Sequence, residues 1–315
     1  MKHKPIEPHA SSERACTELL WLLGQPHLGD YLAFIETKVP GGRDIDARAS
    51  AAEWRAANDL YCELEQEEAG IADTIRCAPI GRALAPLARA VKANPWFRSS
   101  FDNLPVTIER VELDKLIMSQ THVESSFTEA LGGTLGAAPD EAALFRFCLP
   151  LERPSPPVRI QRLSGDRFLF SSSSTDFRAH HPRLLAPAEL AGLTSVGPVV
   201  AMVGIMVGFG SNFMSAIRSG SRLLLQNGYH RAYTLRSLGF RHAYCIVEEV
   251  TRKDELKLTA SEDIVADPEF YFAAKRPPLL RDYFDPRLAR KLTVLPMENQ
   301  VEVELKIRSQ TATDW

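Results

Sequence analysis

The stretch "RLLLQNGYHRAYTLRSLGFRHAYCIVEEV", residues 222–250, decides the fold that we expect. Its first five residues are mostly apolar and predict a strand, after which Gly228 indicates a turn. A helix of about nine residues follows, and Gly239 is well placed to end it because glycine readily adopts the left-handed conformation found there. Residues 242–250 predict a second strand. The stretch therefore predicts a strand–helix–strand unit.

The turn "NGYHR", residues 227–231, has the chemistry of an anion site. The first N–H groups of a helix lack intrahelical partners and carry partial positive charge, and Gly228 lets a ligand approach the backbone. Arg231 could hold a phosphate with its planar guanidinium, and His230 could donate a hydrogen bond or move a proton near neutral pH. The alternative is that Asn227 and Gly228 form an ordinary turn with Arg231 in solvent.

The charge pattern around this turn favours the anion site. Residues 190–247 contain no Asp or Glu, although 24% of the whole chain is charged and its net charge is -3. The same span carries basic side chains at Arg218, Arg222, Arg231, Arg236, Arg241, His230 and His242. We therefore expect a locally positive neighbourhood that attracts phosphates or carboxylates. The acidic overall balance argues against a surface coated in basic charge for general nucleic-acid binding.

Other segments predict mixed secondary structure. Apolar residues alternate over residues 106–111, which is typical of a half-buried strand. Residues 139–149 predict a helix, and residues 158–163 and 167–172 predict the two arms of a hairpin. Residues 299–309 alternate between apolar and charged side chains, like a strand with one wet face.

Three further segments are interpreted as helical. Residues 12–93 are rich in Ala, Leu and Glu, and we expect a helical domain there. The apolar run "VGPVVAMVGIMVGFGSNFM", residues 196–214, is interrupted by glycines and is too short in its uninterrupted part to span a membrane, so it predicts a buried helix around residues 198–218. Residues 275–292 predict a proline-broken linker followed by a short helix.

The sequence also bears on the compartment. Five cysteines occur without a CxxC spacing, so neither a disulfide framework nor a zinc site is expected, and the thiols are interpreted as reduced. The beginning of the chain, "MKHKPIEPHASSE", has no apolar core and is not interpreted as a signal peptide. We expect a cytoplasmic protein without a membrane span.

A polar cluster follows the strand predicted over residues 106–111. Gln120, His122 and Glu124 stand where a strand ends, which is a usual place for ligand contacts. If the chemistry needs a general base, Glu124 is the best candidate. The alternative is a plain polar loop.

A second polar cluster, residues 171–183, closes the predicted hairpin. Ser174 and Arg178 are candidate ligand contacts in it. The adjacent histidines 180 and 181 are not expected to bind a metal, because no partner has ligand spacing. The alternative for this loop is an ion pair between Asp176 and Arg178.

With these residues in view, the chain resembles the ParB/sulfiredoxin-like superfamily. Residues 223–250 follow that family's order of strand, turn with glycine and arginine, helix, glycine and strand. Residues 106–123 look like its opening strand and glutamine-containing box. Together they anchor residues 104–250, with an insertion between them. Tyr229 stands where sulfiredoxins carry a cysteine, so thiol-based reduction is not expected.

The resemblance implies a nucleotide site. Its phosphates would be held by the turn: Asn227, Gly228, Tyr229, His230 and Arg231. Gln120 and Glu124 would lie near the ligand, and Ser174 and Arg178 are added as contacts. Mg²⁺ is expected with a nucleoside triphosphate, His230 and Glu124 are the catalytic candidates, and the protein itself is expected to provide no metal site. DNA remains a possible partner, although no helix-turn-helix is seen after residue 250.

The expected fold class is α+β. We expect a helical N-terminal domain over residues 1–95, a ParB/sulfiredoxin-like mixed-sheet core over residues 104–250, and a C-terminal strand extension over residues 251–315 that packs on the core. The leading hypothesis is a nucleotide-binding phosphotransferase or phosphohydrolase. The alternatives are a non-catalytic, nucleotide-responsive regulator or nucleic-acid-associated protein, and a pocket for a carboxylate metabolite. The sequence leaves the base preference and the oligomeric state open.

Overall fold

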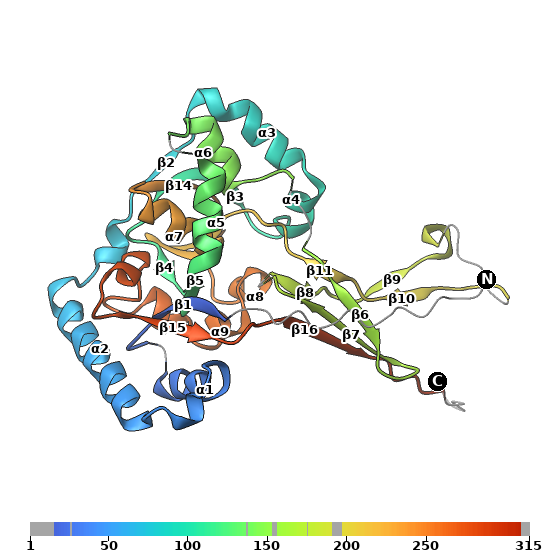
Figure 1. The fold of residues 1–315 in the computed structure, drawn as a ribbon. Helices are drawn as coiled ribbons and strands as arrows, with labels where there is room; N and C mark the ends of the chain where they lie inside the picture. Colours follow the sequence, from blue (N-terminus) through green and yellow to red (C-terminus); the bar gives the residue numbers. More distant parts are fainter. Residues whose placement is uncertain are drawn as a thin grey trace. The chain divides into compact units, whose positions relative to one another are not determined.

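A computed structural model describes residues 16–25, 27–136, 138–152, 156–174, 176–190 and 197–309. Helices and sheets are both present, as the α+β class predicts (Figure 1). The chain forms two compact units, Met1–Leu151 with Phe213–Pro296 and Glu152–Asn212 with Met297–Trp315. These bounds differ from the expected domains, because the first unit combines parts of all three. Its two segments meet where the Met214 N–H donates to the Cys148 carbonyl, 3.0 Å away.

The first unit is built on a six-stranded mixed sheet with the order β2-β3-β14-β12-β13-β4. Its strands are β2 (Cys77–Pro79), β3 (Val106–Glu112), β4 (Ile117–Met118), β12 (Ser215–Ser219), β13 (Arg222–Asn227) and β14 (His242–Val250). β12 pairs in parallel with β14, and β13 with β4, whereas the other neighbours are antiparallel. β14 is buried from Ala243 to Glu248, and its continuous apolar run is typical of a central strand covered on both faces.

The predicted strand–helix–strand unit is confirmed. β13 leads into α7 (Tyr229–Ser237), and β14 follows. Gly228 and Gly239 flank the helix with φ angles of +96° and +86°. Both glycines therefore adopt the left-handed conformation that other residues rarely tolerate.

A second sheet in this unit corrects the helical prediction for residues 12–93. β1 (Thr17–Leu22) is a strand, and it lies between β15 (Ala289–Val294) and β5 (His122–Glu124) with antiparallel pairing on both sides. A central strand needs a continuous apolar run, and a run as short as "LLWLL" fits a strand as well as a buried helix. The short helix predicted at the end of residues 275–292 is also wrong, because β15 begins there.

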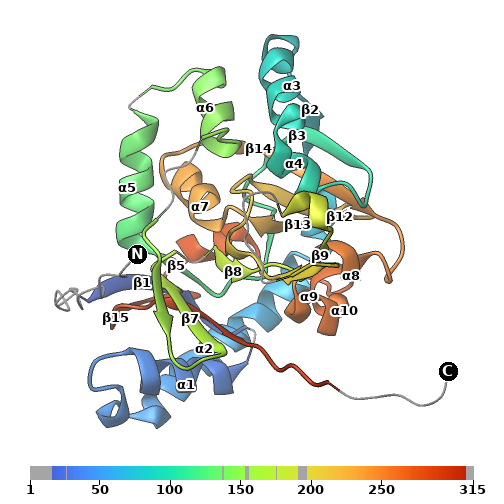
Figure 2. The same ribbon diagram turned by 90° about the vertical axis from the view of Figure 1, so that its right-hand side faces the viewer.

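The first unit also contains helices besides α7 (Figure 2). They are α1 (Leu28–Lys38), α2 (Ala47–Glu67), α3 (Ala85–Ala93), α4 (Pro95–Ser100), α5 (Ser125–Leu135), α6 (Glu141–Cys148), α8 (Leu256–Thr259), α9 (Glu262–Ala266) and α10 (Pro268–Phe272). α6 confirms the helix predicted over residues 139–149, and β3 confirms the strand over residues 106–111. Within the described part of the chain, no helix is both long and apolar enough to cross a bilayer. The expectations for residues 1–15 lie outside the described residues.

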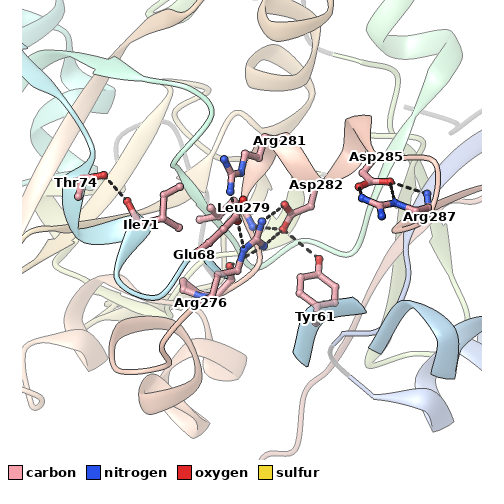
Figure 3. A network of polar contacts seen from close by, with 11 residues as sticks. Tyr61, Glu68, Ile71, Thr74, Arg276, Leu279, Arg281, Asp282, Asp285 and Arg287 are labelled. Atoms are coloured by element: carbon pink, nitrogen blue, oxygen red, sulfur yellow. Dashed lines mark hydrogen bonds and ion pairs between the residues drawn. The ribbon is translucent and has the colours of Figure 1, made fainter. Parts of the chain in front are cut away.

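A buried ionic network holds the end of α2 to the segment before β15 (Figure 3). Arg276, only 1% exposed, pairs through both terminal nitrogens with Asp282, and its Nε donates to Glu68 3.1 Å away. The Tyr61 hydroxyl donates to Asp282, and Arg281 also pairs with Glu68. Each charge in this network thus has an oppositely charged partner, which a buried charge requires.

The second unit consists of short antiparallel sheets. β6 (Arg159–Arg162) and β7 (Arg167–Ser172) confirm the predicted hairpin, and β16 (Asn299–Glu304) adds the predicted tail strand beside β7. Two ribbons complete it: β8 (Phe177–Ala179) with β11 (Val207–Phe209), and β9 (Arg183–Leu185) with β10 (Met202–Gly204).

The helix predicted around residues 198–218 is wrong. This region instead contains β10, β11 and β12. Its glycines and β-branched valines explain the difference, because glycine costs about 1 kcal/mol in a helix interior and valine fits a strand better. The predicted burial of this run is also wrong, since Val200 and Val203 are 87% and 69% exposed.

Candidate functional site

The turn between β13 and α7 requires glycine at its centre. Gly228 precedes the helix with a φ of +96°, and a Cβ atom built on it would lie 2.5 Å from the Met214 Cγ atom. Both the backbone conformation and the packing therefore exclude a side chain here. Asn227, the residue before it, ends β13 opposite Ser215.

His230 lies in the first turn of α7 and is only 8% exposed. The Phe127 ring of α5 packs edge-on against its imidazole, with 5.1 Å between the ring centroids. Among the described residues, no side chain or backbone group forms a hydrogen bond with the imidazole. Burial, aided by His122 and Arg231, lowers the pKa of His230 to about 4, so the ring is neutral at pH 7.

Arg231 is buried and faces α6. Its Nη1 donates to the Cys148 carbonyl at the end of α6, 2.7 Å away. The last carbonyls of a helix lack intrahelical partners, so Arg231 satisfies one of them. The alternative in which Arg231 points into solvent is wrong. The arginine adds positive charge beside the turn while holding α6 in place.

Tyr229 links the turn to the segment that follows β4, and this segment contains Gln120. The Tyr229 hydroxyl and the Ser119 Oγ are 2.6 Å apart, and burial raises the pKa of this phenol well above its ordinary value. The Gln120 amide donates to the His122 carbonyl 2.6 Å away, and the Tyr283 hydroxyl donates to the Gln120 carbonyl. The predicted neighbourhood of the turn and the glutamine segment is therefore present in the structure.

His122 and Glu124 belong to β5. The His122 ring stacks on Trp21 with 5.4 Å between centroids, and burial lowers its pKa to about 4. Glu124 is the last residue of β5, directly before α5, and its Oε1 accepts from the Ser126 hydroxyl 2.7 Å away. The carboxylate thus stands at the start of one helix, and His230 at the start of another.

Ser174 and Arg178 belong to the second unit, whereas the turn belongs to the first. The Ser174 carbonyl accepts from the Asn299 side chain 2.8 Å away. Arg178 forms an ion pair with Asp176, which was the alternative for this loop. These contacts give each residue a role within the second unit.

The charges of the acid-free stretch are largely compensated. Three of its five arginines pair with carboxylates from other segments: Arg218 with Glu109, Arg222 with Asp73 and Arg236 with Asp114. The stretch is positive in sequence, but the folded chain brings acids to it. The expectation of a broadly positive neighbourhood is therefore corrected to a narrower one at Arg231 and the helix start.

Ser119 and Phe127, the partners of Tyr229 and His230, were missed in the sequence. Ser119 follows β4, whereas Phe127 belongs to α5, which was not predicted although "SSFTE", residues 125–129, has the serines and glutamate typical of a helix start. In the described part of the chain, no group of three or more His, Cys, Asp or Glu side chains is placed to hold a metal ion.

Comparisons with protein-family models, with curated proteins and with solved structures found no match for this chain.

Proposed function

We propose that the chain binds the phosphates of a nucleotide at the start of α7, in a core arranged like that of the ParB/sulfiredoxin-like superfamily, as a nucleotide-dependent phosphotransferase or phosphohydrolase. The observation that carries the proposal is His230, which is 8% exposed and has no hydrogen-bond partner among the described residues. In the described part of the chain, the one fully buried side-chain nitrogen or oxygen atom without a partner is Gln25 Oε1, so the ring nitrogens of His230 are open to solvent and a ligand can reach them. A phosphate oxygen would satisfy the imidazole and the first N–H groups of α7 together.

The neighbouring residues have distinct roles in this proposal. His230 would donate to a phosphate oxygen, and Gly228 would leave the backbone accessible. Arg231 acts as a positioning residue: it anchors α6 and adds positive charge beside the phosphates. Mg²⁺ bound mainly by phosphates needs only one or two protein carboxylates, and Glu124 is the candidate for that contact or for the general base.

One observation favours the alternative of a nucleotide-responsive regulator. Burial keeps both His122 and His230 neutral, and Arg231 is engaged by the Cys148 carbonyl. Phosphoryl transfer requires strong stabilisation of developing negative charge, whereas binding does not. A regulator would therefore bind the nucleotide at the same site without hydrolysing it or transferring its phosphate.

Calorimetry with ATP, CTP and GTP, each with and without Mg²⁺, tests the proposal. We expect at least one nucleotide to bind and His230→Ala to weaken it about 10-fold or more, since a hydrogen bond to a charged group contributes roughly 1.5–3 kcal/mol. His27→Ala, the same change at an exposed histidine, is the matched control and should leave binding unchanged. If none of the nucleotides binds, the proposal is wrong.

Turnover separates the enzyme from the regulator. We expect the bound nucleotide to release phosphate or transfer it to an acceptor, and Glu124→Gln to slow that step while binding persists. Binding without turnover in the unmodified chain would favour the regulator. A gel shift with DNA at several salt concentrations tests the nucleic-acid version, because phosphate contacts give a steep salt dependence.

A further inference from the structure

A cleft of about 460 Å³ lies between α5 and α7 in the first unit, with β1 and β15 supplying the rest of its wall. This volume falls within the range of about 300–1,000 Å³ that is common for small-molecule sites. The helices lie side by side, since Thr234 of α7 donates to the Thr128 carbonyl of α5 3.1 Å away. The residues of the cleft differ from those assigned to the nucleotide.

Three of the five hydroxyl groups that line this cleft already donate their hydrogens to backbone carbonyls. Thr128 donates to the Ser125 carbonyl, Thr234 to the Thr128 carbonyl and Ser237 to the Thr234 carbonyl, at 2.8, 3.1 and 2.8 Å. A hydroxyl has one hydrogen to donate and two lone pairs that accept. These side chains therefore offer a ligand only acceptors, which favours a ligand rich in N–H or O–H donors.

The charged side chains of the cleft carry a net charge of -1. Lys291 pairs with Glu18, with 2.9 Å between Nζ and Oε1. Glu129 lines the same cleft, and no Lys, Arg or His of the described residues lies within ion-pair distance of it. The two carboxylates together raise the pKa of Lys291, Glu18 having the larger effect. The remaining carboxylate favours a positively charged ligand over a neutral one.

Two glycines in α5 keep this cleft open. Gly132 and Gly133 lie inside the helix, where each costs roughly 0.5–1 kcal/mol relative to alanine. A Cβ atom at Gly133 would meet no other atom within 4 Å, and one at Gly132 would touch Thr234 at 3.6 Å. Larger side chains at Gly133 would therefore enter the cleft without disturbing the fold.

We propose that this cleft binds a small organic amine. Its ammonium group contacts the Glu129 carboxylate and donates to the hydroxyl oxygens of Thr128 and Ser237, while its carbon chain follows the gap at Gly133. The site goes beyond the nucleotide proposal and uses different residues. The cleft selects ligands that carry a positive charge and several hydrogen-bond donors.

Three four-carbon probes that differ in charge test this selection: butane-1,4-diamine, butane-1,4-diol and succinate. Thermal unfolding and calorimetry on the full chain should show stabilisation and binding with the diamine and neither with the other two. Glu129→Gln should weaken diamine binding at least 10-fold. Glu63→Gln, the same change at an exposed glutamate of α2, is the matched control and should bind like the unmodified chain.

Gly133→Leu provides a second variant. Leucine favours a helix more than glycine does, so the chain should fold at least as stably while the side chain fills the cleft and diamine binding is lost. Failure of the diamine to bind, equal stabilisation by the diol or succinate, or diamine binding that survives in Gly133→Leu would each overturn the proposal. The nucleotide test stays separate, because Glu129→Gln leaves His230 and the first turn of α7 unchanged.

Discussion

At the scale of single residues, Gly228 sets the strictest requirement. We expect Gly228→Ala to lower the free energy of unfolding by about 2–4 kcal/mol, because the left-handed conformation and the overpacking against Met214 each contribute. Urea denaturation measures this change. Gly81→Ala is the control: its φ is -60° and a Cβ atom there would meet nothing within 4 Å, so its stability should stay equal or rise slightly. Equal effects of the two changes would contradict the packing argument.

The burial of His230 predicts how the free energy of unfolding depends on pH. Its pKa is about 4 in the folded chain and about 6.5 when solvated, so the unfolded state binds more protons between these values. Stability should therefore be full above pH 6.5 and fall as the pH drops toward 4, with a loss of about 2 kcal/mol between pH 7.5 and 5 from this group. His122 should add to this fall, since its pKa is lowered in the same direction.

Urea unfolding at several pH values for the unmodified chain and for His230→Gln measures that contribution. The variant should show a shallower decline below pH 6.5. His27→Gln, at an exposed position, should keep the original slope. An unchanged slope in His230→Gln would show that this imidazole does not titrate as its burial requires.

At the scale of elements, the sequence predicted secondary structure best where the hydrophobic period and the turn-forming glycines indicated the same element. The unit β13–α7–β14 carries a glycine at each end of its helix, and its bounds were predicted almost to the residue. β1 was missed, because whether "LLWLL" becomes a strand or a helix depends on β15 and β5, which lie far away in sequence. The charge pattern wrongly predicted a broadly positive neighbourhood for the same reason. Glu109, Asp73 and Asp114 are distant in sequence and reach the arginines only after folding.

The ionic network between α2 and the segment before β15 gives an element-scale prediction. Asp282→Asn should lower the free energy of unfolding by about 3–5 kcal/mol, because it leaves Arg276 buried without its closest carboxylate. Arg287→Ala breaks an exposed pair with Asp285 and should cost less than about 1 kcal/mol. A double-mutant cycle of Asp282→Asn with Arg276→Met measures the coupling, and a coupling near zero would contradict the role given to the network.

At the scale of the whole molecule, the two units should be separable. The hydrogen bond between Met214 and Cys148 brings the two segments of the first unit together close to where the second begins. A chain that joins Leu151 to Phe213 through a short Gly-Ser linker and ends at Pro296 should therefore unfold cooperatively, as measured by circular dichroism. A fragment of residues 152–212 lacks β16, which pairs with β7. It should not unfold cooperatively, because isolated two-stranded ribbons have marginal stability. If the joined chain shows no cooperative unfolding transition, the division into two separable units is contradicted.

The position of β1 has a consequence for biosynthesis. Residues 17–22 leave the ribosome well before β15, one of the two strands that flank them, because β15 is encoded at residues 289–294. At about 5–20 residues per second, the nascent chain waits on the order of 10–50 s before that partner exists. During this interval the apolar "LLWLL" segment lacks β15 beside it. We therefore expect a chaperone to bind this segment before β15 has been synthesised.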